Sequence, residues 1–133
     1  MKINNIGYNH CHDADFNIYR PHGSGDNLLL ILKTTAVFTI NGKEQTAQPN
    51  SFILYKKGTP QFYRADGCPY ANDWFHFDID EEDEEFLRDL KIPFDKVVRI
   101  GDINPLSNLV KSMCYENFST NLYKADSTRH YLS

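Results

Sequence analysis

The sequence predicts a mainly β protein with helices toward its C-terminus. Residues 14–77 contain short apolar segments separated by Gly, Pro and Asn turn residues at regular spacing. This pattern is typical of an antiparallel sandwich or barrel of the jelly-roll type. Residues 80–133 instead show helical apolar spacing. The length of 133 residues is that of one domain, because two domains would each be too short to bury a core.

Composition and charge exclude several classes of protein. The chain is 41% hydrophobic and 24% charged, as soluble globular proteins are. Its net charge of −4 argues against a surface whose main role is to bind nucleic acid, since such a surface is basic. The longest apolar run, residues 28–32, is too short to cross a bilayer, and the N-terminus has no signal-peptide segment. We therefore expect a cytoplasmic protein with no membrane partner and with reduced cysteines.

The predicted strands are short and end at turn residues. They cover residues 15–20, 28–32, 36–40, 43–47, 51–55, 61–64 and 74–77. Asn41-Gly42 is the strongest turn signal, because a type I′ hairpin needs positive φ at both central residues. Residues 28–32 are apolar on both faces, so this strand is expected to be buried on both sides.

The first predicted helix begins after Asp80, which is a suitable N-cap. Acidic residues fill its first turn, where the helix dipole favours negative charge, so the acidic run indicates a solvated helix start rather than a metal site. Phe86, Leu87 and Leu90 form a short apolar stripe on this helix. Residues 96–100 are expected to add one more strand.

Two further helices are predicted near the C-terminus, at residues 104–118 and 122–132. The apolar face of the first could form a dimer interface or pack on the barrel. The chain ends at Ser133 without a helix-stop signal, which suggests a longer protein. The expected organisation is an N-terminal arm (1–13), a barrel (14–100) and a helical dimerisation region (101–133).

Arg20 is the most informative single residue. Alternate side chains of a strand share a face, so Phe16, Ile18 and Arg20 point the same way. If that face is the barrel interior, the guanidinium needs a carboxylate, a carbonyl or a polar ligand as a partner. The alternative is that Arg20, next to Pro21, lies at the strand end and reaches solvent.

The last predicted strand offers two different faces. Trp74 and His76 share one face, and Phe75 and Phe77 share the other, so either pair could point inward. An inward Trp74 and His76 would create a pocket with a flat apolar wall for a sugar or a planar ligand. The alternative is that Trp74 fills the core and His76 is a buried, hydrogen-bonded histidine.

Motifs for metal binding and catalysis are weak. Only His10 and His12 among the five histidines are closely spaced, and they precede the first predicted strand, so a mobile arm is the preferred interpretation. No nucleophile elbow, phosphate loop or dinucleotide motif is present. We expect no metal, no cofactor and no catalytic residue. Gln61 and Tyr63 share a face and could line the mouth of a barrel.

Several segments together carry a family resemblance. They are Arg20-Pro21-x-Gly23, Leu28-Leu29-Leu30, Asn41-Gly42, Ser51-Phe52-Ile53-Leu54, Lys57-Gly58-Thr59-Pro60 and Trp74-Phe75-His76-Phe77. Their order and spacing over residues 14–78 resemble the N-terminal sensor domain of AraC-family transcription regulators. No single segment is highly specific.

The resemblance implies a cupin-like jelly-roll barrel that binds a small effector, often a sugar, beside helices that form a homodimer. DNA would be contacted only by a C-terminal domain with two helix-turn-helix units, which this chain does not include. The competing readings are a small cupin enzyme, such as a dioxygenase or isomerase, and a stand-alone carbohydrate-binding module.

The resemblance also implies ligand-binding residues. Arg20 would hold the ligand, Tyr63 would follow the proline turn, and Trp74 would stack on a sugar. His76 would add an orienting hydrogen bond. Asn72 stands where the arabinose-binding member has histidine, and glutamine stands where the family commonly has histidine after the proline. These two differences leave the identity of the ligand open.

Overall fold

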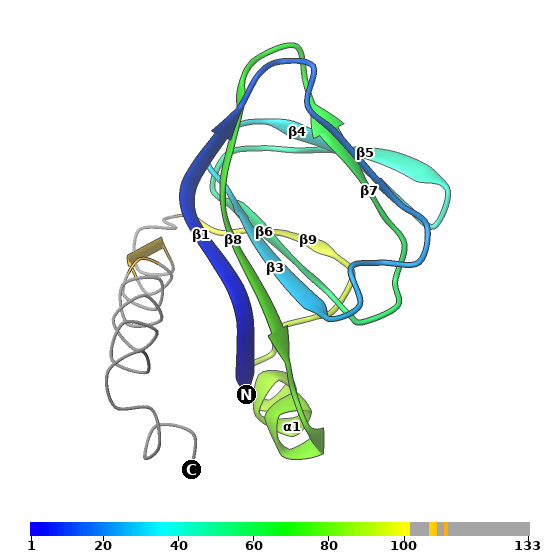
Figure 1. Cartoon of the computed structure of the whole chain (residues 1–133), viewed down its shortest axis with the longest axis vertical. Coiled ribbons are helices and arrows are strands. Elements are labelled where there is room, and N and C mark those ends of the chain that lie inside the picture. The colour runs from blue at the N-terminus through cyan, green and yellow to red at the C-terminus, as the bar shows by residue number, and fades with distance from the viewer. Residues whose placement is uncertain (102–106, 109–110, 112–133) are drawn as a thin grey trace, which may run out of the picture.

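The computed structural model shows two antiparallel sheets that face each other, with one helix at one end (Figure 1). It describes residues 1–101, 107, 108 and 111. The first sheet has the order β1 (Lys2–His12), β8 (Tyr70–Asp78), β3 (Asn27–Leu32), β6 (Ser51–Tyr55) and β9 (Val97–Arg99). The second sheet has the order β2 (Asn17–Arg20), β7 (Gln61–Ala65), β4 (Ala36–Ile40) and β5 (Lys43–Ala47).

The strand order is consistent with the predicted jelly roll, because β1, β8, β3 and β6 are neighbours in one sheet and β2, β7, β4 and β5 are neighbours in the other. The prediction of a closed barrel is not met. Among the described residues no ladder joins the two sheets, so they form an open sandwich. The edge strands β1, β2, β5 and β9 each hydrogen-bond to one neighbour only.

The predicted hairpin forms at the expected residues. Asn41 and Gly42 have φ angles of 54° and 76°, and Ile40 pairs with Lys43 in the ladder between β4 and β5. Both central residues therefore have the left-handed backbone that a type I′ turn requires. The turn sets the register of the two strands.

Strand β3 is buried on both faces, as its apolar run predicts. Leu28, Leu30 and Leu32 contact the core between the sheets, whereas Ile31 contacts a second apolar cluster on the outer face of the first sheet. All four side chains have at most 1% exposure. One strand thus connects the two cores.

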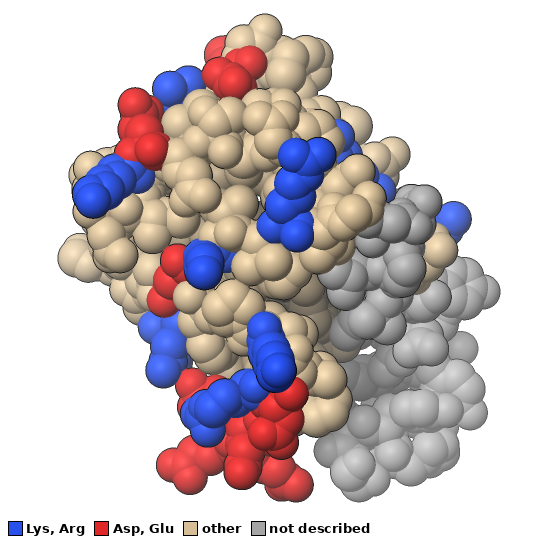
Figure 2. Space-filling view, turned by 180° about the vertical axis from the view of Figure 1, so that it is seen from behind, with Lys and Arg blue, Asp and Glu red and all other residues tan. Residues whose placement is uncertain are grey.

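Helix α1 (Glu81–Asp89) covers the outer cluster at one end of the first sheet. A capping box starts it, since Asp80 accepts from the Asp83 backbone and Asp83 accepts from the Asp80 backbone. Acidic side chains gather at this end of the molecule with Lys and Arg beside them (Figure 2). The expected apolar stripe is only partly buried: Leu87 packs inward, but Phe86 and Leu90 are exposed.

The expected N-terminal arm is largely a strand. Lys2–His12 pair with β8 along its whole length, with two irregularities in register. The sequence did not indicate this because most of β1 is exposed, so it lacks the apolar alternation of a half-buried strand. Backbone hydrogen bonds to β8 order the segment instead.

The C-terminal predictions are mostly untested. The helices expected at 104–118 and 122–132 fall outside the described residues, apart from positions 107, 108 and 111. The strand expected at 96–100 forms as β9. Within the described part of the chain, no helix is long and apolar enough to cross a membrane.

Candidate functional site

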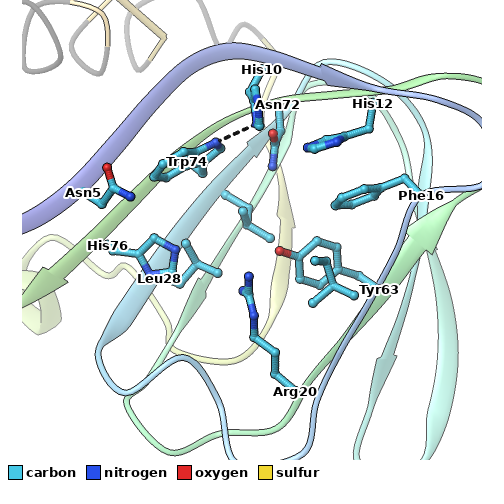
Figure 3. A pocket seen from close by; sticks show the side chains of 12 residues that line it. Asn5, His10, His12, Phe16, Arg20, Leu28, Tyr63, Asn72, Trp74 and His76 are labelled. Carbon is cyan, nitrogen blue, oxygen red and sulfur yellow. Dashed lines mark hydrogen bonds between the residues drawn. The ribbon is translucent and has the colours of Figure 1, made fainter.

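A cavity of about 260 Å³ lies between the inner faces of the two sheets (Figure 3). Strands β1, β2, β3, β7 and β8, with the residues just before β2, provide its walls. The lining residues are Asn5, His10, His12, Phe16, Ile18, Arg20, Leu28, Leu30, Tyr63, Asn72, Trp74 and His76. All five residues expected to bind a ligand are among them: Arg20, Tyr63, Asn72, Trp74 and His76. The structure thus brings these residues together, although their role in binding stays a prediction.

Strand β8 directs its alternate residues to opposite faces. Trp74 and His76 line the cavity, whereas Phe75 and Phe77 belong to the outer apolar cluster. The inward orientation that would create a pocket is therefore the one present. Asn72 lines the cavity on the same face.

Arg20 points into the cavity together with Phe16 and Ile18, as the spacing on that strand predicts. Its Nη1 donates a hydrogen bond of 3.0 Å to Oε1 of Gln61 on the paired strand β7. Gln61 is fully buried. The partner of the guanidinium is therefore a neutral amide rather than a carboxylate.

A chain of hydrogen bonds continues from Gln61 to His76 through the loop between β2 and β3. Gln61 Nε2 donates to Ser24 Oγ at 3.1 Å, and Ser24 Oγ donates to Asp26 Oδ1 at 2.8 Å. His76 Nδ1 lies 2.8 Å from the same carboxylate oxygen. A carboxylate only accepts, so Nδ1 of His76 carries the proton. This chain ties the loop between β2 and β3 to both sheets.

The hydrogen bonds to Asp26 affect its acidity. Burial acts to raise the pKa of Asp26, but hydrogen bonds from His76, Asn4 and Ser24 outweigh it. The pKa therefore lies below the ordinary value of 3.8. Asp26 is consequently an anion at neutral pH.

Tyr63 contributes a protonated phenol to the cavity. Burial raises its pKa to about 12, and the positive charge of Arg20 nearby opposes that shift. At neutral pH the hydroxyl can both donate and accept a hydrogen bond. Figure 3 shows this hydroxyl directed toward the side chain of Arg20.

Asn72 has an acceptor without a partner. The residue is 3% exposed, and its Nδ2 donates to the hydroxyl of Tyr70 at 2.8 Å. Its Oδ1 is buried and makes no hydrogen bond among the described residues. An unmet buried acceptor costs about 1–3 kcal/mol.

Trp74 depends on a glycine in the neighbouring strand. Gly7 pairs with Trp74 in the ladder between β1 and β8, and a Cβ at position 7 would overlap the indole. Only glycine therefore leaves room for the ring where it is. The indole Nε1 also donates to His10 Nδ1 at 3.1 Å, so β1 holds the ring from two points.

Sequence reasoning missed Asn5, His10 and His12 as cavity residues. The His-x-His pattern places both imidazoles on one face of a strand, but the strand itself was not recognised. The His12 ring stacks on Phe16 with centroids 4.1 Å apart. In the described part of the chain, no three His, Cys, Asp or Glu side chains are grouped so that they could hold a metal.

No family model and no curated protein matches this sequence. Among solved structures, the chain is similar to a Cupin_2 domain of an XRE-family transcriptional regulator from Enterobacter cloacae. The identity is 16%, the match covers 52% of this chain and 77% of that chain, and the TM-score is 0.42.

Proposed function

We propose that this chain is the effector-binding domain of an AraC-type transcription regulator and that the cavity binds a small hydroxylated ligand of the sugar class. The observation that carries the proposal is the gathering of Arg20, Tyr63, Asn72, Trp74 and His76 around one cavity. Its volume of about 260 Å³ lies just below the roughly 300–1,000 Å³ of pockets for drug-sized ligands, which suits a ligand of monosaccharide size.

The lining offers complementary chemistry for such a ligand. Trp74 provides a flat apolar wall for the C–H face of a ring. Asn72 provides an amide, Tyr63 a hydroxyl, and Arg20 several donors. Because these groups converge from three strands, a ligand of defined stereochemistry would satisfy them together.

The proposed role is binding and signalling rather than catalysis. Ligand in the cavity would favour one arrangement of a homodimer, and through it one arrangement of a separate DNA-binding domain. A ligand shifts such an equilibrium only by its different affinities for the two states. In this proposal the dimer interface lies within residues 101–133, where the sequence predicts helices.

The test uses the single tryptophan of the chain as a probe of the cavity. Sugars, sugar acids and divalent metals are titrated while Trp74 fluorescence and thermal stability are recorded. A true ligand at a hundredfold excess over Kd raises stability by about 2.7 kcal/mol. We expect one class of hydroxylated ligand to bind, and Asn72→Ala to weaken it at least tenfold.

Tyr19→Ala is the matched control, since Tyr19 lies on β2 beside Arg20 but is 74% exposed and does not line the cavity. Its binding should equal that of the wild type. Stabilisation by metals alone would contradict the proposal and favour a cupin enzyme. A gene that does not continue into helix-turn-helix sequence would favour a stand-alone carbohydrate-binding module.

A further inference from the structure

We propose, on the basis of the function proposed above, that the ligand carries a carboxylate and that Arg20 binds it. The ligand class would then be a small hydroxylated acid, such as a sugar acid, rather than a neutral sugar. The starting observation is the charge of the cavity. Arg20 is the only Lys, Arg, Asp or Glu among the twelve residues that line it.

The guanidinium of Arg20 has unused hydrogen-bond donors. It carries five N–H groups; its Nη1 donates to Gln61, and the hydroxyl of Tyr63 is a second hydrogen-bond partner. Within the described residues, no carboxylate lies within 4.0 Å of it. Arg64 on the outside of the same sheet differs, because its Nη2 lies 3.3 Å from Glu44 Oε2. The cation inside the cavity thus has no anion beside it.

The carboxylate at the far end of the hydrogen-bond chain is already engaged. Asp26 accepts from Ser24 and His76 at Oδ1 and from Asn4 at Oδ2. It reaches Arg20 only through Ser24 and Gln61, so it does not pair with the guanidinium directly. A ligand carboxylate would pair with it, and the planar fork of arginine fits that group with two parallel hydrogen bonds.

The opposite wall of the cavity sets the orientation of the ligand. In Figure 3 the side chains of Arg20 and Asn72 enter the cavity from opposite sides, with Trp74 and His76 along a third. Asn72 is an uncharged amide, so this wall offers a carboxylate no counter-charge. The acid group therefore lies at Arg20, the hydroxylated end of the ligand lies toward Asn72, and the C–H face lies on Trp74.

The experiment compares matched pairs that differ in the carboxylate: glucose with glucuronate, and galactose with galacturonate, with gluconate as an open-chain acid. Dissociation constants are measured by Trp74 fluorescence and by calorimetry at constant ionic strength. We expect the acid of a pair to bind at least tenfold more tightly than the neutral sugar, a difference of about 1.4 kcal/mol.

Two arginine variants locate the effect. Arg20→Met should abolish the preference for the acid, whereas Arg64→Met, which removes an equal charge outside the cavity, should retain it. Arg20→Lys keeps the charge but not the fork, so it should retain part of the preference. This variant serves if Arg20→Met fails to fold.

The outcomes separate this inference from the function on which it rests. If the neutral sugar of a pair binds as tightly as its acid, the carboxylate is excluded and the sensing function stands. If the acid binds better but Arg20→Lys and Arg20→Met leave the preference unchanged, Arg20 is not the anchor. If no member of any pair binds, both proposals are overturned.

Discussion

The two faces of the first sheet differ in how the side chains of β8 pack on them. On the outer face, Phe75 and Phe77 of β8 stack with ring centroids 4.8 Å apart and pack with Leu87 of α1. On the inner face, the alternating residues Trp74 and His76 border a cavity. The outer face is filled with apolar side chains, whereas the inner face leaves space and vacant hydrogen-bonding groups. Packing of the outer cluster and lining of the cavity therefore fall to residues one position apart.

The largest effect should come from removing an aromatic ring on the filled face. Phe75→Ala leaves a void in a closed cluster and should lower the free energy of unfolding by about 3–5 kcal/mol. Trp74→Ala only enlarges an existing cavity, so its cost should be less than about half of that. Urea unfolding followed by circular dichroism measures both. An equal loss of unfolding free energy in the two variants would show that the two faces do not differ in packing.

A second test adds a methyl group beside the inner face. In Gly7→Ala the new Cβ would overlap the indole of Trp74, so the ring must leave its position. Such overpacking typically costs about 1–3 kcal/mol. We expect lower stability, altered Trp74 emission and weaker ligand binding.

Gly101→Ala is the control for this variant, because a Cβ at position 101 meets no atom of the described residues within 4 Å. It should change neither stability nor emission. Unchanged emission in Gly7→Ala would show that β1 does not position the indole.

A smaller effect should appear in the pH dependence of stability. The pKa of Asp26 is lower in the folded protein than its ordinary value of 3.8, so its stabilising contribution is complete above that value. The contribution is lost as the pH falls through the folded pKa. Asp26→Asn should cost about 1–2 kcal/mol at pH 7 and less at pH 3. The measurement is urea unfolding at a series of pH values.

The exposed Asp66 provides the comparison. Asp66→Asn also removes one carboxylate, but this carboxylate is exposed to solvent and distant from Asp26 in the sequence. Its stability should follow that of the wild type at each pH. If Asp26→Asn loses stability equally at pH 7 and pH 3, the hydrogen bonds to Asp26 do not depend on an ionised carboxylate.

Local sequence features determined most of the secondary structure. The Asn41-Gly42 turn needs only two residues that accept positive φ, and the Asp80 cap needs only its own helix start. Period-two spacing likewise determined that Trp74 and His76 share a face, and that Arg20 shares one with Ile18. These properties depend on neighbours in the chain, so the sequence was sufficient for them.

Only the tertiary structure decided which faces point inward and what meets there. Whether Trp74 or Phe75 points inward depends on which face of β8 packs toward the second sheet and which packs toward α1. Strand β1, with its Gly7, is identified only by its pairing with β8, because the hydrogen bonds that order it come from the backbone of β8. The link from Arg20 to Asp26 joins residues distant in sequence. The sequence by itself therefore determined the local backbone and the alternation of faces, while long-range packing decided the cavity and its chemistry.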